Sequence, residues 1–328
     1  MLRLDQKLAK IHAGAYTRAD FIIADAKDPD MGPSIWATGP NRQADGSSTR
    51  NRTRAEFLDA IRAILKQDVV DIMLTSVSNL EVLTESKSFA GTGVKPAVRA
   101  NDTTDIWVNR GAGYTSQPSR PFRTASPAAF APLTDLGLYS ITFNNTLDWD
   151  VAALEAFAAF REDAAKQGVK YFLEVFNPNV PTGIAADVLP HYINDCIGRC
   201  LAGLTKAERP QFLKIAYNGP KALDELASYD PSLVVGVLGG GAGTTRDCFE
   251  LIQQAEKYGA RVALFGRKIN LAEAPLEMVK HMRLVASGDL KPSEAVRSYH
   301  DALTKGKIAP YRALGADDAV TESVLKSA

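Results

Sequence analysis

The segment FLKIAYNGPKALDELASYDPSLVVGVLGGGAGTTRDCFELIQQAEKYGARVALFGR occupies residues 212–267 and carries the clearest pattern in this sequence. It contains three apolar stretches of strand length, FLKIAYN, LVVGVLGGG and RVALFGR, and a segment with apolar residues at helical spacing separates each from the next. Strands that alternate with helices pair in parallel through crossover connections. This part of the chain therefore predicts an α/β protein with a parallel sheet.

The same alternation extends towards the N-terminus. Five further strand segments lie at residues 20–27, 70–76, 95–101, 138–144 and 170–176, and helical segments lie at 53–67, 151–168, 186–204, 221–229 and 244–259. Eight such units in about 250 residues match a closed (β/α)8 TIM barrel. We predict one domain with a core over about 20–287 and a C-terminal helical extension over 288–328, in which residues 293–305 form a helix. An open, doubly wound sheet is the alternative.

Two connections are unusually long for this fold. Residues 28–52 follow the first strand and residues 102–132 follow the third, and both are rich in polar, Gly and Pro residues. Loops of more than about 15 residues are often lids, binding loops or oligomer arms. Both follow the carboxyl ends of strands, where barrel enzymes place their active sites. We expect lids at the barrel mouth, with subunit contacts as the alternative.

Composition narrows the class of partner. The 328 residues include 38 Lys plus Arg and 38 Asp plus Glu, so no net charge directs the protein to nucleic acid or to an anionic membrane. The sequence has no membrane-length apolar window and no signal-peptide pattern. Three cysteines are too few for a disulfide framework. We expect a cytoplasmic homo-oligomer that binds a phosphorylated or otherwise anionic small molecule.

Lys214 is the most informative polar residue, because apolar residues flank it on both sides within FLKIAYN. Desolvation disfavours a charged amine, and an unprotonated lysine can attack a carbonyl carbon to form a Schiff base. A lysine paired with a carboxylate for purely structural reasons would produce the same pattern. The sequence therefore makes Lys214 the candidate nucleophile.

Other polar residues lie on strands at a spacing of two, which places the members of each pair on one face. If these faces point inwards, they converge with Lys214 near the barrel mouth. Asp25 and Glu174 are then candidates for proton transfer, and Lys27, together with Arg99, for holding an anionic group or lowering the pKa of the Lys214 amine. The candidate substrate-binding residues are Arg99, Asn101, Thr142 and Asn144.

A glycine run follows the seventh strand directly. Gly239, Gly240 and Gly241 leave backbone amides accessible, and Gly266 with Arg267 supplies a second close approach and a cation after the eighth strand. Barrels often hold a phosphate between these two loops. The sequence therefore predicts a phosphate site here, although a tight turn would explain the glycines equally well.

No cofactor or metal is expected. The glycine run lacks the acidic residue that completes a dinucleotide-binding fingerprint, and no histidine pair has the spacing of zinc ligands. A magnesium ion held by Asp25, Asp28, Asp30 and Glu174 is the alternative.

The motifs LKIAYNGP, LVVGVLGGG and VALFGRKIN, together with the opening IIADAKDPDMG, resemble class I Schiff-base aldolases. They are similar to the archaeal-type fructose-bisphosphate aldolases and to deoxyribose-phosphate aldolase-like barrels. The resemblance covers residues 20–285 in strand order. It implies a TIM barrel in which Lys214 forms the imine, Asp25 lies near it, and the glycine loops with Arg267 bind phosphate.

The sequence departs from that family pattern at several positions. Thr142, Phe143 and Asn144 stand where the fourth strand of the family carries an acid/base tyrosine, and Lys268 replaces an asparagine after the Gly-Arg pair. Tyr217 has a hydroxyl, but its strand parity is opposite to that of Lys214. We predict a lysine-dependent carbon–carbon lyase acting on a ketose-like substrate. The alternatives are a barrel isomerase, decarboxylase or acyl-transferring lyase that uses the lysine as a cation, and a non-catalytic sugar-phosphate-binding protein.

Overall fold

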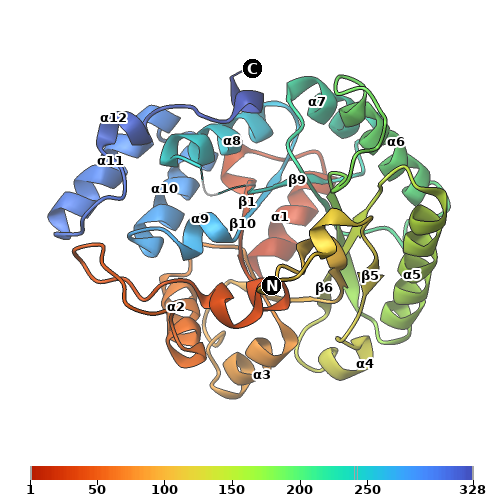
Figure 1. Ribbon diagram of the computed structural model, residues 1–328, viewed down its shortest axis with the longest axis horizontal. Helices are drawn as coiled ribbons and strands as arrows, with labels where there is room; N and C mark the ends of the chain where they lie inside the picture. The colour runs from red at the N-terminus through yellow and green to blue at the C-terminus, as the bar shows by residue number, and fades with distance from the viewer. Residues whose placement is uncertain (1, 240, 242, 327–328) are drawn as a thin grey trace.

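A computed structural model describes residues 2–239, 241 and 243–326. Eight parallel strands close into a barrel in the order β1-β10-β9-β8-β7-β6-β3-β2 (Figure 1). Because β1 pairs with both β2 and β10, the sheet has no free edge, and the alternative of an open sheet is excluded. The predicted TIM barrel is confirmed. Its strands are β1 (Ile22–Lys27), β2 (Ile72–Thr75), β3 (Lys95–Arg99), β6 (Leu136–Thr142), β7 (Lys170–Phe176), β8 (Leu213–Ile215), β9 (Val235–Leu238) and β10 (Val262–Phe265).

Helices surround the barrel (Figure 1). All five helical segments expected from the sequence are present, with ends shifted by a few residues. The ring consists of α2 (Arg54–Gln67), α3 (Val77–Glu85), α4 (Pro127–Phe130), α5 (Leu147–Lys166), α6 (Leu189–Leu201), α7 (Pro220–Tyr229), α8 (Thr245–Lys257), α9 (Arg267–Asn270) and α10 (Pro275–Ser287). Among the described residues, no helix is both long enough and apolar enough to cross a bilayer.

The strands bury apolar side chains on both faces, and these form two separate clusters. The inner cluster fills the barrel and includes Ile22, Ala24, Leu138 and Phe212. Helix α1 (Arg3–His12) contributes Leu4 and Leu8 to it, and therefore closes the N-terminal end of the barrel. The outer cluster joins the alternate strand residues, such as Ile23, to the helices. Membership in these clusters shows which residues of a strand face inwards, since the face alternates along a strand.

The two long connections have secondary structure of their own, which the sequence did not predict. Residues 28–53 contain the 3-10 helices η2 (Pro29–Met31) and η3 (Ser34–Thr38). Residues 102–126 contain a small antiparallel hairpin of β4 (Asp102–Thr103) and β5 (Pro121–Phe122), with η4 (Thr104–Ile106) and η5 (Tyr114–Ser116) between its strands. Within it, the Trp107 ring stacks on Tyr114 with 5.0 Å between centroids. We call residues 102–122 the mouth hairpin.

The C-terminal extension packs on the helical layer outside the barrel (Figure 1). It contains α11 (Pro292–Lys305), which confirms the predicted helix, and then α12 (Leu314–Asp317) and η6 (Ser323–Leu325). The carboxylate of Asp317 accepts a hydrogen bond from the Thr245 amide at 2.9 Å, and that of Asp247 accepts one from the Thr321 amide at 2.7 Å. These two contacts attach the extension to the first turn of α8. The short helix η1 (Arg18–Asp20) lies at the other end of the chain and precedes β1.

Candidate active site

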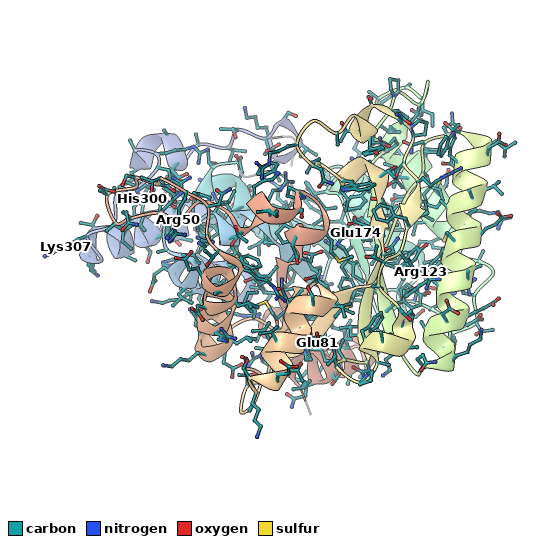
Figure 2. The ribbon with its side chains drawn as sticks, turned by 60° about the horizontal axis from the view of Figure 1, so that its bottom comes forward. Arg50, Glu81, Arg123, Glu174, His300 and Lys307 are labelled. Atoms are coloured by element: carbon teal, nitrogen blue, oxygen red, sulfur yellow. The ribbon has the colours of Figure 1, made fainter. Side chains whose placement is uncertain are left out.

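Lys214 lies inside the barrel. It shares its strand face with Phe212, which belongs to the inner cluster, and its side chain is only 7% exposed. Glu174 on β7 is its neighbour across the parallel strand pair, and the two side chains form an ion pair. Figure 2 labels Glu174 in the interior of the molecule, among the strands. The sixth and fifth strands of the barrel therefore bring the candidate nucleophile against a buried carboxylate.

Arg99 on β3 holds the Glu174 carboxylate oxygen that does not contact Lys214. Its guanidinium donates to Glu174 Oε2 at 3.2 Å and to Ser140 Oγ at 2.9 Å, and Ser140 Oγ in turn donates to the same Glu174 oxygen at 2.6 Å. Asp28, directly after β1, pairs with the Arg99 Nε atom. Burial opposes the charge on Arg99, but the carboxylates of Asp28 and Glu174 outweigh it and raise the Arg99 pKa above its usual range. Arg99 and Ser140 thus hold the Glu174 carboxylate beside Lys214, and Asp28 holds Arg99.

Asp102 is a third buried carboxyl group near this cluster. It begins the mouth hairpin, and the side chain accepts a hydrogen bond from the Thr103 amide at 3.0 Å. Burial raises the pKa of Asp102 to about 7, and the nearby charges of Asp28 and Glu174 act in the same direction against the opposing pull of Arg99.

Asp102 and Ser140 were not among the residues selected from the sequence, and Asp28 was considered only as a magnesium ligand. A strand period of two extended from Leu138 through Ser140 to Thr142 would have found Ser140. No comparable signal was available for Asp28 or Asp102, because Asp28 follows the end of β1 and Asp102 begins the two-residue strand β4, which the sequence did not predict.

Asp25 and Lys27 do not meet Lys214, and the expectation that they point into the barrel is wrong. The inward residues of β1 are Ile22, Ala24 and Ala26, so Asp25 and Lys27 share the outer face with Ile23. Their side chains pair with each other at 2.9 Å, fully buried. Burial raises the pKa of Asp25 and lowers that of Lys27. The spacing of two placed them on one face, but it did not say which face.

The side chains of Asn101, Thr142 and Asn144 gather near the barrel mouth and bind protein groups there. The Asn101 amide accepts from the Ser140 N–H at 2.6 Å and donates to the Ser140 carbonyl at 2.8 Å, which continues the pairing of β3 with β6. Thr142 donates to Asp105 of the mouth hairpin at 3.0 Å. Asn144 Oδ1 accepts from the Asn179 amide at 3.1 Å, and its buried Nδ2 has no partner among the described residues. Substrate binding by these three residues stays a prediction.

Close strand packing explains two of the glycines predicted to bind phosphate. A Cβ atom on Gly239 would lie 2.4 Å from the Phe265 ring, and one on Gly266 would lie 2.8 Å from the Ala26 carbonyl oxygen. Gly241 has Glu322 Oε1 as its nearest neighbour at 3.8 Å, and Gly240 lies outside the described residues. Arg267 begins α9 with an exposed side chain. Phosphate binding at these loops therefore stays a prediction, and Gly239 and Gly266 have a sufficient structural reason to be glycine.

A cavity of about 150 Å³ lies beyond the ends of β8 and β9, beside these loops. Its lining includes Ala216, two residues after Lys214, and Lys268, whose Nζ atom lies 3.3 Å from the Gly243 carbonyl oxygen. Within the part of the chain that the structure describes, no carboxylate lies within 4.0 Å of Lys268 Nζ. Tyr217 also lines the cavity, but its hydroxyl donates to Gln254 on α8 at 2.8 Å and does not reach towards Lys214.

The carboxylates named for magnesium do not form a single site. Asp25 faces the helices, Asp30 accepts hydrogen bonds from Ser76 and Asn79, and Asp28 and Glu174 both bind Arg99. Over residues 2–239, 241 and 243–326, no group of three or more His, Cys, Asp or Glu side chains is placed to hold a metal ion.

Fold and site together define a (β/α)8 barrel with a buried lysine on its sixth strand. Solved structures support the fold. A Schiff-base-forming fructose-1,6-bisphosphate aldolase is 16% identical over 86% of this chain and 99% of its own, with a TM-score of 0.63. An archaeal fructose 1,6-bisphosphate aldolase is 15% identical over 87% of this chain and 99% of its own, with a TM-score of 0.62. Cgl0159 from Corynebacterium glutamicum is 16% identical over 87% of this chain and 94% of its own, with a TM-score of 0.57.

No protein-family model and no curated protein matches this chain. At the identities of the structural neighbours, the similarity establishes the barrel fold. It agrees with the fold that the resemblance to archaeal-type class I aldolases implied.

Proposed function

We propose that the protein is a class I aldolase-like carbon–carbon lyase, in which Lys214 forms a Schiff base with a ketose-like substrate. The observation that carries the proposal is the buried pair of Lys214 and Glu174 inside the barrel. A nucleophile beside a base that a third group orients is the arrangement that activates an amine. Here Arg99 and Ser140 are the orienting groups.

The first half-reaction follows from this geometry. Glu174 takes a proton from the Lys214 ammonium, and the free amine attacks the substrate carbonyl carbon to give a carbinolamine. Loss of water then leaves a protonated imine, whose positive nitrogen accepts the electron pair of the carbon–carbon bond when it breaks. Arg99 holds the Glu174 carboxyl group in place through a hydrogen bond of 3.2 Å to its Oε2 atom.

The proposed substrate class is phosphorylated or otherwise anionic. Two neighbouring structures are named as fructose bisphosphate aldolases, which supports a phosphate-bearing substrate. Within this chain, the support comes from the cavity beside β8 and β9, where the Lys268 ammonium donates to the Gly243 carbonyl and to the Thr245 hydroxyl. The carboxylates of Asp247 and Glu322 line the same cavity, so an anion would have to bind on its Lys268 side.

Reductive trapping tests the proposal. The purified protein is incubated with dihydroxyacetone phosphate, dihydroxyacetone or pyruvate, borohydride is added, and the intact mass is measured. We expect wild type to gain the mass of one reduced adduct and Lys214→Met to gain none. Lys221→Met is the control, because Lys221 is exposed on α7. An adduct of equal yield on Lys214→Met would contradict the proposal.

The ion pair itself favours a second candidate. If Glu174 keeps Lys214 protonated, the ammonium would stabilise an enolate as a cation, which suits an isomerase or a decarboxylase. Lys214→Arg separates the two mechanisms. A guanidinium can replace a cation but cannot form the imine, so retained turnover in this variant would favour the second candidate.

A further inference from the structure

Three buried carboxyl groups surround Arg99, and only two of them are ion-paired. Asp28 and Glu174 each contact the guanidinium. Asp102 is 2% exposed, yet within the described residues it has no Lys, Arg or His nitrogen within 4.0 Å. A buried carboxyl group without a cation is costly to keep ionised. Asp102 therefore differs from Asp28 and Glu174, because no ion pair accounts for a carboxyl group buried at this position.

The hydrogen bonds of Asp102 leave one oxygen free. Oδ1 accepts from the Thr103 amide, while Oδ2 has no hydrogen-bond partner among the described residues. Asp25 also has an Oδ2 atom without a partner among the described residues, but that atom is fully enclosed, whereas Asp102 Oδ2 keeps some contact with solvent. Asp102 Oδ2 therefore has unused capacity to accept a hydrogen bond. Its pKa of about 7, which burial raises from the ordinary carboxyl range, lets the group both accept and donate a proton near neutrality.

The position of Asp102 is fixed by its neighbours on both sides. Asn101 precedes it and is held by two hydrogen bonds to the backbone of Ser140 on β6. On the other side, Asp102 pairs with Phe122 in the mouth hairpin. The carboxyl group therefore lies at the end of β3 that carries Arg99, and the charges of Arg99 and Glu174 act on it directly. Asp102 therefore lies beyond the carboxyl end of β3, near the Arg99 and Glu174 side chains.

We propose that Asp102 is the acid/base residue that transfers protons to and from the carbon skeleton of the Lys214-bound substrate. This inference rests on the proposed function and supplies a group for the proton that Glu174 does not handle. In cleavage, Asp102 takes the proton from the substrate hydroxyl, and the electron pair of that O–H bond becomes the π bond of the new carbonyl group. The electron pair of the breaking carbon–carbon bond forms the carbon–carbon double bond of an enamine. The π electrons of the protonated imine move at the same time onto its nitrogen. Asp102 then returns the proton to the enamine carbon, and water releases the ketone from Lys214.

The test separates imine formation from proton transfer at carbon. Dihydroxyacetone phosphate, dihydroxyacetone and pyruvate are each incubated with the protein in D2O, and loss of the α-proton signal is followed by NMR. The same probes are trapped with borohydride in parallel. Variants are Asp102→Asn and, as a control, Asp224→Asn, which removes an exposed carboxylate on α7. The exchange rate is also measured from pH 5 to 9.

We expect Asp102→Asn to be trapped as fully as wild type while its α-proton exchange falls at least about 100-fold. Wild-type exchange rises as the carboxyl group ionises near pH 7, and the variant loses that rise. Exchange at the wild-type rate in Asp102→Asn overturns the inference. Loss of trapping and exchange together also overturns it, because Asp102 would then be needed to form the imine or the fold. No trapping of wild type by any probe overturns the proposed function as well.

Discussion

Two buried lysines in this barrel, Lys27 and Lys214, share almost every property that a sequence can reveal. Each lies in a strand, each is almost fully buried, and each pairs with one carboxylate. They differ in the face that they occupy. Lys27 points at the helices beside Asp25, whose second oxygen is enclosed and has no partner among the described residues, whereas Lys214 points into the barrel beside a carboxylate that Arg99 and Ser140 orient. Burial alone therefore does not distinguish the two lysines, and the strand face does.

The largest expected effect on stability is at the outer pair. Lys27→Met leaves the Asp25 carboxylate buried without the one cation that pairs with it among the described residues, and breaking a buried ion pair from one side typically costs about 3–5 kcal/mol. Urea unfolding of the variant should show this loss, and Asp25→Leu combined with Lys27→Met should recover most of it. A free energy of unfolding within about 1 kcal/mol of wild type, which is the typical effect of a single substitution, would contradict a buried ion pair at this position.

At the inner pair, the largest effect apart from removal of the lysine is on rate. Glu174→Gln keeps the shape of the side chain and removes the base, so adduct formation should slow by about 10²–10⁴-fold. The rate of borohydride trapping measures this. Trapping at the wild-type rate in Glu174→Gln would mean that Glu174 only holds Lys214 in place.

The pH dependence of stability should separate Asp102 from both lysine pairs. Because its pKa is raised to about 7, the folded protein holds a proton that the unfolded chain releases near pH 4. Stability from this group is therefore greatest below pH 4 and declines as the pH rises towards 7, by at most about 4 kcal/mol. Asp102→Asn should lack this decline in urea unfolding between pH 4 and 8, and parallel curves for variant and wild type would be inconsistent with a raised pKa.

The smallest effect should come from Ser140. Ser140→Ala removes one hydrogen bond to Glu174 while Arg99 continues to hold it, and a hydrogen bond to a charged group contributes about 1.5–3 kcal/mol. We expect trapping to slow about tenfold, which is less than for Glu174→Gln. An equal or larger effect would place Ser140 in direct contact with the reacting atoms.

The sequence predicted the fold well because the barrel rests on a repeated local pattern. All eight strands were located, since each is a short apolar run, and helical spacing adjoins most of them. The sequence did not determine which residues of a strand face inwards, because both faces of a barrel strand are apolar. The polar residue that breaks the pattern could therefore face either way, which is why Lys214 was placed correctly and Asp25 with Lys27 were not.

The remaining site residues escaped for physical reasons as well. Asp28 and Asp102 follow strand ends, where strand period no longer fixes direction, and only the closed barrel brings both to Arg99. The glycines after β9 and β10 suggested access for a ligand, but Gly239 and Gly266 are required by the close approach of Phe265 and Ala26. A glycine in a sequence indicates that another group approaches the backbone closely, but it does not indicate whether that group belongs to the protein or to a ligand.

Peptide mapping of the borohydride-trapped protein tests the contrast between Lys27 and Lys214 most directly, since it shows which of these lysines carries the adduct. The protein is reduced with the ketone probes present, digested, and sequenced by tandem mass spectrometry. We predict that the added mass lies on Lys214 alone and that Lys27 remains unmodified, because only Lys214 faces the barrel interior. An adduct on Lys27, or on surface lysines with Lys214 untouched, would contradict the account.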